Sequence, residues 1–153
     1  NIVHLVQTIN PNCSFIATIS PVRHLKDGFF ENLTSKSHLI AAVYELIQIK
    51  ELELNYFPSF EIMIDELRDY RFYGEDLLHP NTTAIDYIWS RFAENYITEF
   101  SFKLMTEVDS IQKSLRHKPF NTESTSHQKF LKNLNEKIEK LQSVNPFITF
   151  LNK

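Results

Sequence analysis

Glycine is scarce in this chain. At an average usage of about 7%, a chain of this length would hold about 11 glycines, but only Gly28 and Gly74 occur. Phosphate-binding loops and the sharp turns that present a nucleophilic serine need glycine, because the backbone there approaches a ligand closely or adopts a positive φ angle. No serine follows a glycine, and no Gly-x-Ser-x-Gly string is present. The sequence therefore excludes both features in their usual form.

The composition is that of a globular protein with one core. Of the 153 residues, 42% are hydrophobic and 23% are charged, which suffices for one packed unit and does not require two. The net charge of -3 and the pI near 6.1 provide no basic face that could displace counterions from phosphates, so nucleic acid is not expected as a partner. No uncharged apolar run approaches the roughly 20 residues that a membrane span requires.

The chain holds a single cysteine, Cys13, so no internal disulfide can form and a reduced thiol is expected. The first ten residues lack the basic stretch and the cleavage site of a secretory signal peptide. The location of the protein is not encoded in these residues, although the lone cysteine and the missing signal peptide favour the cytoplasm. Neither a cofactor motif nor a compact metal-ligand spacing such as His-Glu-x-x-His is present, so no cofactor or metal is expected.

The N-terminal part predicts a helix followed by a strand. The apolar residues of 2–9 fall on one helical stripe, which ends at the Asn-Pro-Asn sequence of residues 10–12. The apolar, β-branched run 15–19 is closed by Ser20-Pro21 and suits a strand that is buried on both faces, as in a parallel sheet. A helix followed by such a strand is half of a β-α-β unit, so we expect the chain to be a fragment that begins inside one.

The next part of the chain predicts a helix, a second strand and a long connection. Apolar residues recur at helical spacing over about 34–53. Residues 56–64 are expected to be extended, because apolar and more polar residues alternate there. The segment 65–81 is polar and aromatic without clean periodicity and is long for a connection, which indicates a functional role.

From Thr83 onward the pattern is helical. A broad apolar face continues to Leu115 and predicts one long helix or two, and a further helix is expected over 124–144. These helices predict an antiparallel hairpin, so we expect an α/β unit at 1–100 and a helical extension at 101–153. We expect this hairpin to serve in packing or partner binding. Its second helix carries an apolar stripe: Phe130, Leu134, Ile138 and Leu141.

Two polar clusters follow the predicted strands, where open α/β sheets bind their ligands. They are residues 20–24 (SPVRH) and residues 69–80 (DYRFYGEDLLHP). In the second, Asp76 and His79 are three residues apart, so a carboxylate in a turn can reach the imidazole Nδ1. That contact would leave Nε2 free to accept a proton from a hydroxyl nucleophile. Spacing alone is a weak signal, because an N-capping aspartate beside a surface histidine gives the same pattern.

Arg23 and His24 follow the first predicted strand and have two interpretations. They could contact a substrate or a developing oxyanion, which makes them candidate substrate-binding residues. Alternatively, they could hold the loop through an ion pair to a nearby aspartate, namely Asp27, Asp69 or Asp76. For Asp69 and its neighbour Arg71, an ion pair that stabilises the loop is expected rather than catalysis.

Several long strings, in this order, resemble the C-terminal part of the GSCFA family, which is related to the SGNH/GDSL hydrolases. They are SPVRH (20–24), YFPSFEIM (56–63), DYRFYGEDLLHP (69–80), DYIW (86–89) and Arg91-Phe92. The resemblance covers about Ile2 to Leu141. It implies an α/β chain that forms the C-terminal part of a flavodoxin-like (SGNH-type) three-layer α/β/α fold, followed by the helical hairpin.

The resemblance also implies a function, namely a serine hydrolase that attacks an ester or acetyl carbonyl of a small molecule or saccharide. The Asp-x-x-His block of the family is matched here by Asp76 and His79, the orienting acid and the general base.

The sequence departs from the family pattern because the Gly-Ser-Cys-Phe-Ala block with the nucleophilic serine is absent. The string at 13–17 (CSFIA) has a superficial likeness to it, but no glycine precedes it and it leads into the strand before SPVRH. The expected Gly and Asn oxyanion donors are absent as well. We therefore expect this chain alone to be inactive. The alternative function is a non-catalytic interaction module that uses the C-terminal helices to bind a partner or a second copy, and a sheet short of strands also predicts self-association.

Overall fold

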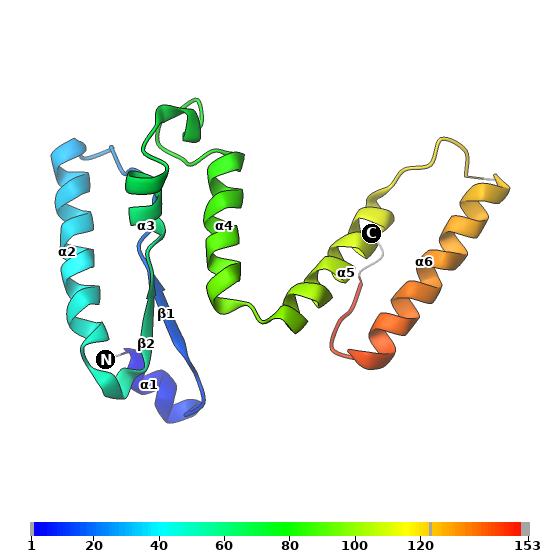
Figure 1. The fold of residues 1–153 in the computed structure, drawn as a ribbon, viewed down its shortest axis with the longest axis horizontal. Helices are drawn as coiled ribbons and strands as arrows, with labels where there is room; N and C mark the ends of the chain where they lie inside the picture. Colours follow the sequence, from blue (N-terminus) through cyan, green and yellow to red (C-terminus); the bar gives the residue numbers. More distant parts are fainter. Residues whose placement is uncertain (1, 123, 151–153) are drawn as a thin grey trace. The chain divides into compact units, whose positions relative to one another are not determined.

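The computed structural model describes residues 2–122 and 124–150, and these residues form a mixed α/β structure with a small parallel sheet and six α-helices (Figure 1). The chain divides into two compact units, Asn1–Tyr96 and Ile97–Lys153. Each unit has a hydrophobic core of its own. Within the described residues, none of the helices is both long enough and apolar enough to cross a membrane.

The N-terminal unit contains a parallel β-α-β arrangement. Helix α1 (Ile2–Ile9) precedes strand β1 (Phe15–Thr18), and helix α2 (Phe29–Ile47) connects β1 to strand β2 (Leu54–Phe57). The two strands pair in parallel, with Phe15 opposite Leu54 and Thr18 opposite Phe57. The predicted first helix, first strand and parallel pairing are confirmed.

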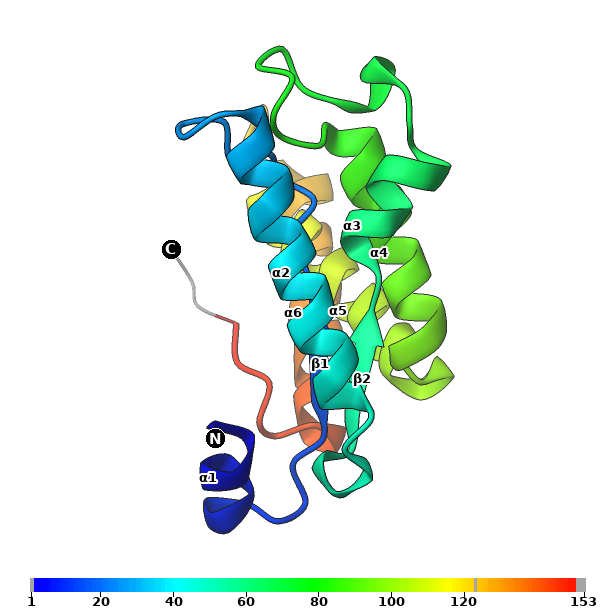
Figure 2. The ribbon, with the colours of Figure 1, turned by 90° about the vertical axis from the view of Figure 1, so that its left-hand side faces the viewer.

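Helices cover both sides of this small sheet. In Figures 1 and 2, α2 lies on one side of the strands and α4 (Thr82–Tyr96) lies on the other. The ring of Phe57 in β2 meets Phe92 and Tyr96 of α4 edge-on, with centroids 5.2 and 6.1 Å apart. The core between β2 and α4 is formed by buried side chains: Phe57, Ile62, Met63, Leu67, Tyr73 and Ala84.

The prediction that residues 56–64 are extended is wrong beyond Phe57. The strand ends at Pro58, and the chain then forms α3 (Ser59–Glu61) and a π-helical segment (Ile62–Glu66). Proline lacks the N–H that a strand ladder needs, whereas its carbonyl accepts the first helical bond from the Ile62 N–H at 2.9 Å. The buried residues Phe60, Met63 and Leu67 are spaced by three and four, which is helical spacing.

The helix predicted over about 34–53 is displaced toward the N-terminus. It begins at Phe29 because Gly28, with φ 117° and ψ 167°, turns the chain into its first turn in a conformation that only glycine adopts readily. It ends at Ile47 and is followed by a 3₁₀ helix (Lys50–Leu52). Glu53, with a left-handed φ of 46°, then redirects the chain into β2.

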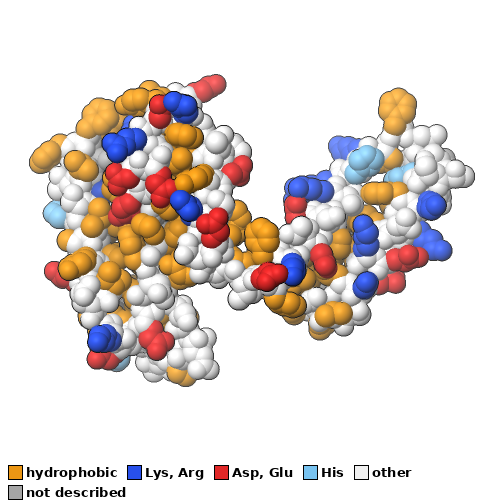
Figure 3. Space-filling view, in the orientation of Figure 1, with side chains coloured by type: hydrophobic (Ala, Val, Ile, Leu, Met, Phe, Trp, Pro, Cys, Tyr) orange, Lys and Arg blue, Asp and Glu red, His pale blue; other side chains and the backbone are white. Residues whose placement is uncertain are grey.

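The prediction that the first strand is buried on both faces is wrong. Its residues alternate between half-buried and exposed positions, and Ile16 is 42% exposed. Among the described residues, β2 is its one pairing partner. Large apolar side chains also lie at the surface of this unit, including Phe29, Leu33 and Tyr44 of α2. Figure 3 shows hydrophobic side chains on the face of this unit that is in view.

The C-terminal unit is a pair of helices, α5 (Glu99–Arg116) and α6 (Thr125–Val144). The helical pattern after Thr83 is thus broken into α4 and α5, and Thr98 caps α5 by accepting a bond from the Ser101 N–H at 3.2 Å. The two helices pack on each other as the predicted hairpin, with Ile111 of α5 against Leu134 and Leu141 of α6. The apolar stripe of α6 therefore faces into the hairpin.

Candidate functional site

Residues 74–80 form a closed loop, here called the His79 loop. Its base is an antiparallel bridge between Tyr73 and Pro80, and the Gly74 N–H donates to the His79 carbonyl at 2.8 Å. At its tip, Leu77 has a left-handed φ of 58°. That conformation is unfavourable for a bulky residue, and such strain is concentrated at functional loops.

Asp76 and His79 contact each other within this loop. His79 Nδ1 lies 2.7 Å from Asp76 Oδ2, while Oδ1 of the same carboxylate accepts hydrogen bonds from the N–H groups of Leu78 at 2.9 Å and His79 at 3.0 Å. The carboxylate thus orients both the backbone and the side chain of His79. The two readings of the Asp-x-x-His spacing are combined here, because Asp76 caps the turn and also binds the imidazole.

These contacts decide which nitrogen of His79 carries the proton. The backbone N–H of His79, the N–H of Leu78 and the imidazole lower the pKa of Asp76 to about 2. The carboxylate is therefore ionised at neutral pH and can only accept hydrogen bonds, so Nδ1 must be the donor. In the neutral imidazole, Nε2 then bears the lone pair. Within residues 2–122 and 124–150, no hydrogen bond reaches Nε2, and the side chain of His79 is 62% exposed.

The two predicted polar clusters are brought together by Arg23. Its N–H donates to the Leu78 carbonyl at 3.2 Å, and its Nη1 donates to the Leu77 carbonyl at 3.2 Å. Its guanidinium also lies over the ring of Tyr73, 4.1 Å from the centroid. The end of β1 and the His79 loop are therefore in direct contact.

The expected ion pairs are present in part. Asp69 Oδ2 and Arg71 Nη2 are 3.1 Å apart, as predicted for this pair. Among the described residues, however, neither Arg23 nor His24 forms an ion pair with an aspartate. His24 is exposed, and its N–H donates to Asn32 Oδ1 at 2.8 Å, which ties the segment after β1 to α2.

Sequence reasoning missed two residues that fix the end of β1. Lys36 in α2 is only 3% exposed, and its Nζ donates to the Ser20 carbonyl at 2.6 Å. Burial lowers the pKa of this amine. Ser59, also buried, donates to the Ile19 carbonyl at 2.7 Å. A lysine within a mixed helical pattern and a serine after a proline are ordinary in a sequence, so neither residue was identifiable as a support of the site.

Asn81 was also missed, and it joins the residues just before the His79 loop to α4. Its Oδ1 accepts a hydrogen bond from the Ala84 N–H at 3.1 Å, which caps the helix. Its Nδ2 donates to the carbonyls of Arg71 at 2.6 Å and Tyr73 at 3.4 Å. An Asn before Thr82-Thr83 is a recognisable helix-cap signal, but its second role depends on long-range contacts.

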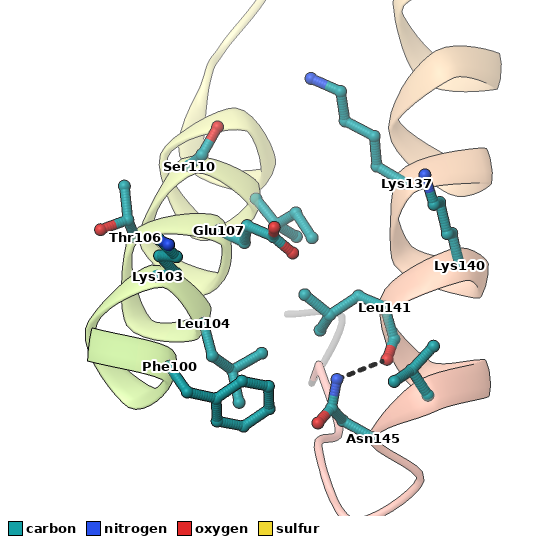
Figure 4. Close-up of a pocket in the computed structure, with 12 residues that line it drawn as sticks. Phe100, Lys103, Leu104, Thr106, Glu107, Ser110, Lys137, Lys140, Leu141 and Asn145 are labelled. Atoms are coloured by element: carbon teal, nitrogen blue, oxygen red, sulfur yellow. Dashed lines mark hydrogen bonds between the residues drawn. The ribbon is translucent and has the colours of Figure 1, made fainter. Parts of the chain in front are cut away.

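A separate groove of about 710 Å³ lies between α5 and α6 in the C-terminal unit. Figure 4 shows Phe100 and Leu104 of α5 facing Leu141 of α6, with lysines at the rim. The lining residues of the groove include Glu107 and three lysines but no histidine or cysteine. In the described part of the chain, no three His, Cys, Asp or Glu side chains lie close enough to hold a metal ion.

The comparisons with known proteins identify a family. The sequence model of the GSCFA family matches residues 1–92, which include both polar clusters and the His79 loop. A second model, described as the C-terminal domain of GSCFA domain proteins, matches residues 108–153. Searches of curated proteins and of solved structures found no match. Because the first model covers more than half of the chain, the protein belongs to the GSCFA family, as its strings indicated.

Proposed function

We propose that this chain contributes the acid–base pair Asp76–His79 to a serine hydrolase that cleaves ester or acetyl groups from a small molecule or saccharide. The observation that supports the proposal is the His79 geometry: Nδ1 is held by an ionised carboxylate, and Nε2 is left open to solvent. This is the arrangement that a general base needs for removing a proton from a hydroxyl.

In the proposed reaction, the serine comes from a Gly-Ser-Cys-Phe-Ala block that these 153 residues do not contain. His79 Nε2 accepts the serine proton as the oxygen attacks the carbonyl carbon. Asp76 stabilises the imidazolium that forms, which then donates its proton to the leaving alcohol oxygen. A water molecule hydrolyses the acyl-enzyme by the same route, and the acid is released.

The fold proposed for this function is the C-terminal part of an SGNH-type three-layer domain. Its support is the parallel pairing of β1 and β2 and the positions of α2 and α4 on opposite sides of the strands. In open parallel sheets, ligands bind at the carboxyl ends of the strands. The segment after β1 lies at such an end and contacts the His79 loop.

The test is hydrolysis of p-nitrophenyl acetate by the complete protein. In His79→Ala the loss of the general base should lower kcat/KM by about 10²- to 10⁴-fold. Asp76→Asn should lower it as well, because an amide can donate to Nδ1 and so favour the wrong tautomer. His38→Ala, which removes an exposed histidine of α2, serves as the matched control and should retain activity. Full activity in His79→Ala would refute the assignment.

The position of the nucleophile has its own test. A fluorophosphonate probe should label the complete protein at the serine of the Gly-Ser-Cys-Phe-Ala block and should not label the isolated 153 residues. Labelling of a serine within the 153 residues would show that the nucleophile lies in this chain.

An exposed apolar stripe on α6 would favour the alternative of a non-catalytic interaction module. Leu134 and Leu141 of that stripe are each 5% exposed and pack inside the hairpin, so the stripe lends this alternative no support. The His79 geometry therefore makes the hydrolase the proposal with the stronger support.

A further inference from the structure

We propose that Arg23 is a positioning residue, which holds the His79 loop against the end of β1 and does not bind substrate. The inference deepens the proposed function and rests on it, because it assumes that His79 is the general base.

Three separate contacts join Arg23 to this one loop. Its backbone N–H and its Nη1 donate to the carbonyls of Leu78 and Leu77, each at 3.2 Å. These two residues lie between Asp76 and His79, so a shift of either carbonyl moves the backbone that carries the pair. The guanidinium plane also lies over the Tyr73 ring at the base of the loop. Arg23 therefore contacts both the tip and the base.

Arg23 is itself attached to a rigid support. The Ser20 Oγ accepts a hydrogen bond from the Val22 N–H at 3.2 Å, and the Ser20 carbonyl is bound by the buried Lys36. Ser59 binds the carbonyl of the preceding residue. On the other side of Arg23, the His24 N–H is bound by Asn32 of α2. The segment after β1 is thus tied to α2 and to α3.

The His79 loop needs such a support. Its own hydrogen bonds determine its internal shape, including the contact of Asp76 with His79, but both side chains are exposed and Leu77 is strained. Among the described residues, the hydrogen bonds that join the tip at Leu77 and Leu78 to the sheet come from Arg23. Loss of the Arg23 side chain should leave the Asp76–His79 contact and the backbone bond to Leu78 intact, and it should let the loop tip at Leu77 move relative to β1.

A positioning role and a substrate-binding role for Arg23 would change different kinetic constants. A misplaced general base slows the chemical step, so kcat should fall while KM changes little. A residue that binds substrate would instead raise KM when it is removed. The guanidinium has no carboxylate partner among the described residues. Substrate binding is therefore the alternative role that the experiment must distinguish from positioning.

The experiment compares Arg23→Lys and Arg23→Met in the complete protein, with Arg71→Met as the matched control. Arg71 lies in the other polar cluster, residues 69–80, and its guanidinium binds Asp69 instead of the His79 loop. Arg23→Lys keeps the charge but loses the planar guanidinium that bonds to Leu77 and covers Tyr73. If Arg23→Met does not fold, Arg23→Lys alone still tests the positioning role. Both variants keep the backbone bond from residue 23 to Leu78 but lose the Nη1 bond to Leu77 and the guanidinium cover of Tyr73. Because two of the three contacts are lost, kcat on p-nitrophenyl acetate should fall by about 10²-fold in each variant with KM unchanged. Arg71→Met should behave as the parent protein.

A second measurement does not depend on activity. In ¹⁵N NMR spectra, the Nδ1 proton signal of His79 should persist in the Arg23 variants, because Asp76 still binds it. The backbone relaxation of Leu77 and Leu78 should show increased motion in these variants and not in Arg71→Met. Unchanged relaxation at the loop tip would overturn the inference.

The outcomes also distinguish this inference from the proposed function. If His79→Ala abolishes activity but Arg23→Met raises KM at unchanged kcat, Arg23 binds substrate and the positioning role is wrong. The same conclusion follows if Arg23→Lys retains full kcat. If His79→Ala is fully active, the proposed function itself fails, whatever the Arg23 variants show.

Discussion

At the residue scale, the Asp76 carboxylate links the shape of the His79 loop to protonation. It accepts two backbone hydrogen bonds and binds the imidazole, which together lower its pKa to about 2. In the unfolded chain these partners are lost, and the pKa of an aspartate is about 3.9. The ionised form of Asp76 is therefore favoured in the folded protein. The stability that this carboxylate contributes is complete above about pH 4 and is lost as the pH falls toward about 2.

The lowered pKa of Asp76 leads to a prediction for the pH dependence of stability in Asp76→Asn. The free energy of unfolding of the parent protein should fall more steeply between about pH 4 and about pH 2 than that of the variant, because the variant has no carboxylate to protonate. Urea unfolding at a series of pH values measures both slopes. Glu75→Gln, which removes the neighbouring exposed carboxylate, is the control and should keep the slope of the parent. Equal slopes for Asp76→Asn and the parent would contradict the expectation.

At the scale of elements, Asn81 links the start of α4 to the segment that leads into the His79 loop. A typical helix cap satisfies a helix N–H, whereas Asn81 also binds the carbonyls of Arg71 and Tyr73 through Nδ2. Its loss therefore removes the cap and leaves these two carbonyls without this donor.

We predict that Asn81→Ala lowers the free energy of unfolding by about 2 kcal/mol or more. Thr98→Ala is the matched control, because Thr98 Oγ1 caps α5 by accepting from the Ser101 N–H and holds no loop carbonyl. Its loss should be about 1 kcal/mol. Chemical denaturation measures both losses. A loss for Asn81→Ala no larger than that for Thr98→Ala would show that the bonds from Nδ2 add nothing to stability.

Also at this scale, the elements differ in how far the sequence predicted them. Helix α6 and strand β1 were recognised, because each has a clear period and a break beside it. Segment 58–66 was misassigned, since a short apolar run fits a strand or a buried helical turn equally well. The start of α2 was placed late, because exposed apolar residues such as Phe29 and Phe30 do not show which face of a helix is buried.

At the scale of the whole molecule, the apolar surface of α2 bears on self-association. Phe29, Leu33, Ile40 and Tyr44 recur on one side of this helix and are between 37% and 75% exposed. Contiguous apolar surface of this kind promotes association in water. We therefore expect the 153-residue chain to associate as its concentration rises, which sedimentation velocity measures.

The surface responsible can be tested by substitution. Leu33→Glu combined with Ile40→Glu places two charges on the apolar side of α2 and should shift the chain toward monomer. The matched control is Ser35→Glu combined with His38→Glu, which adds the same charges to exposed positions on another side of the helix. A monomer at every concentration in the parent chain, or equal shifts in both variants, would contradict the role of this surface.

Local features of this protein are readable in its sequence. The contact of Asp76 with His79 spans three residues and forms within one turn, so the spacing allowed the contact, and the family strings around it singled out the pair. What supports that pair became visible in the folded chain alone. Arg23 lies 54 residues from the carbonyl of Leu77 that it binds, and Lys36 and Ser59 reach the end of β1 from other elements. Such contacts exist because β1 and β2 pair in parallel and bring distant segments to one edge, a long-range arrangement that no local period in the sequence encodes.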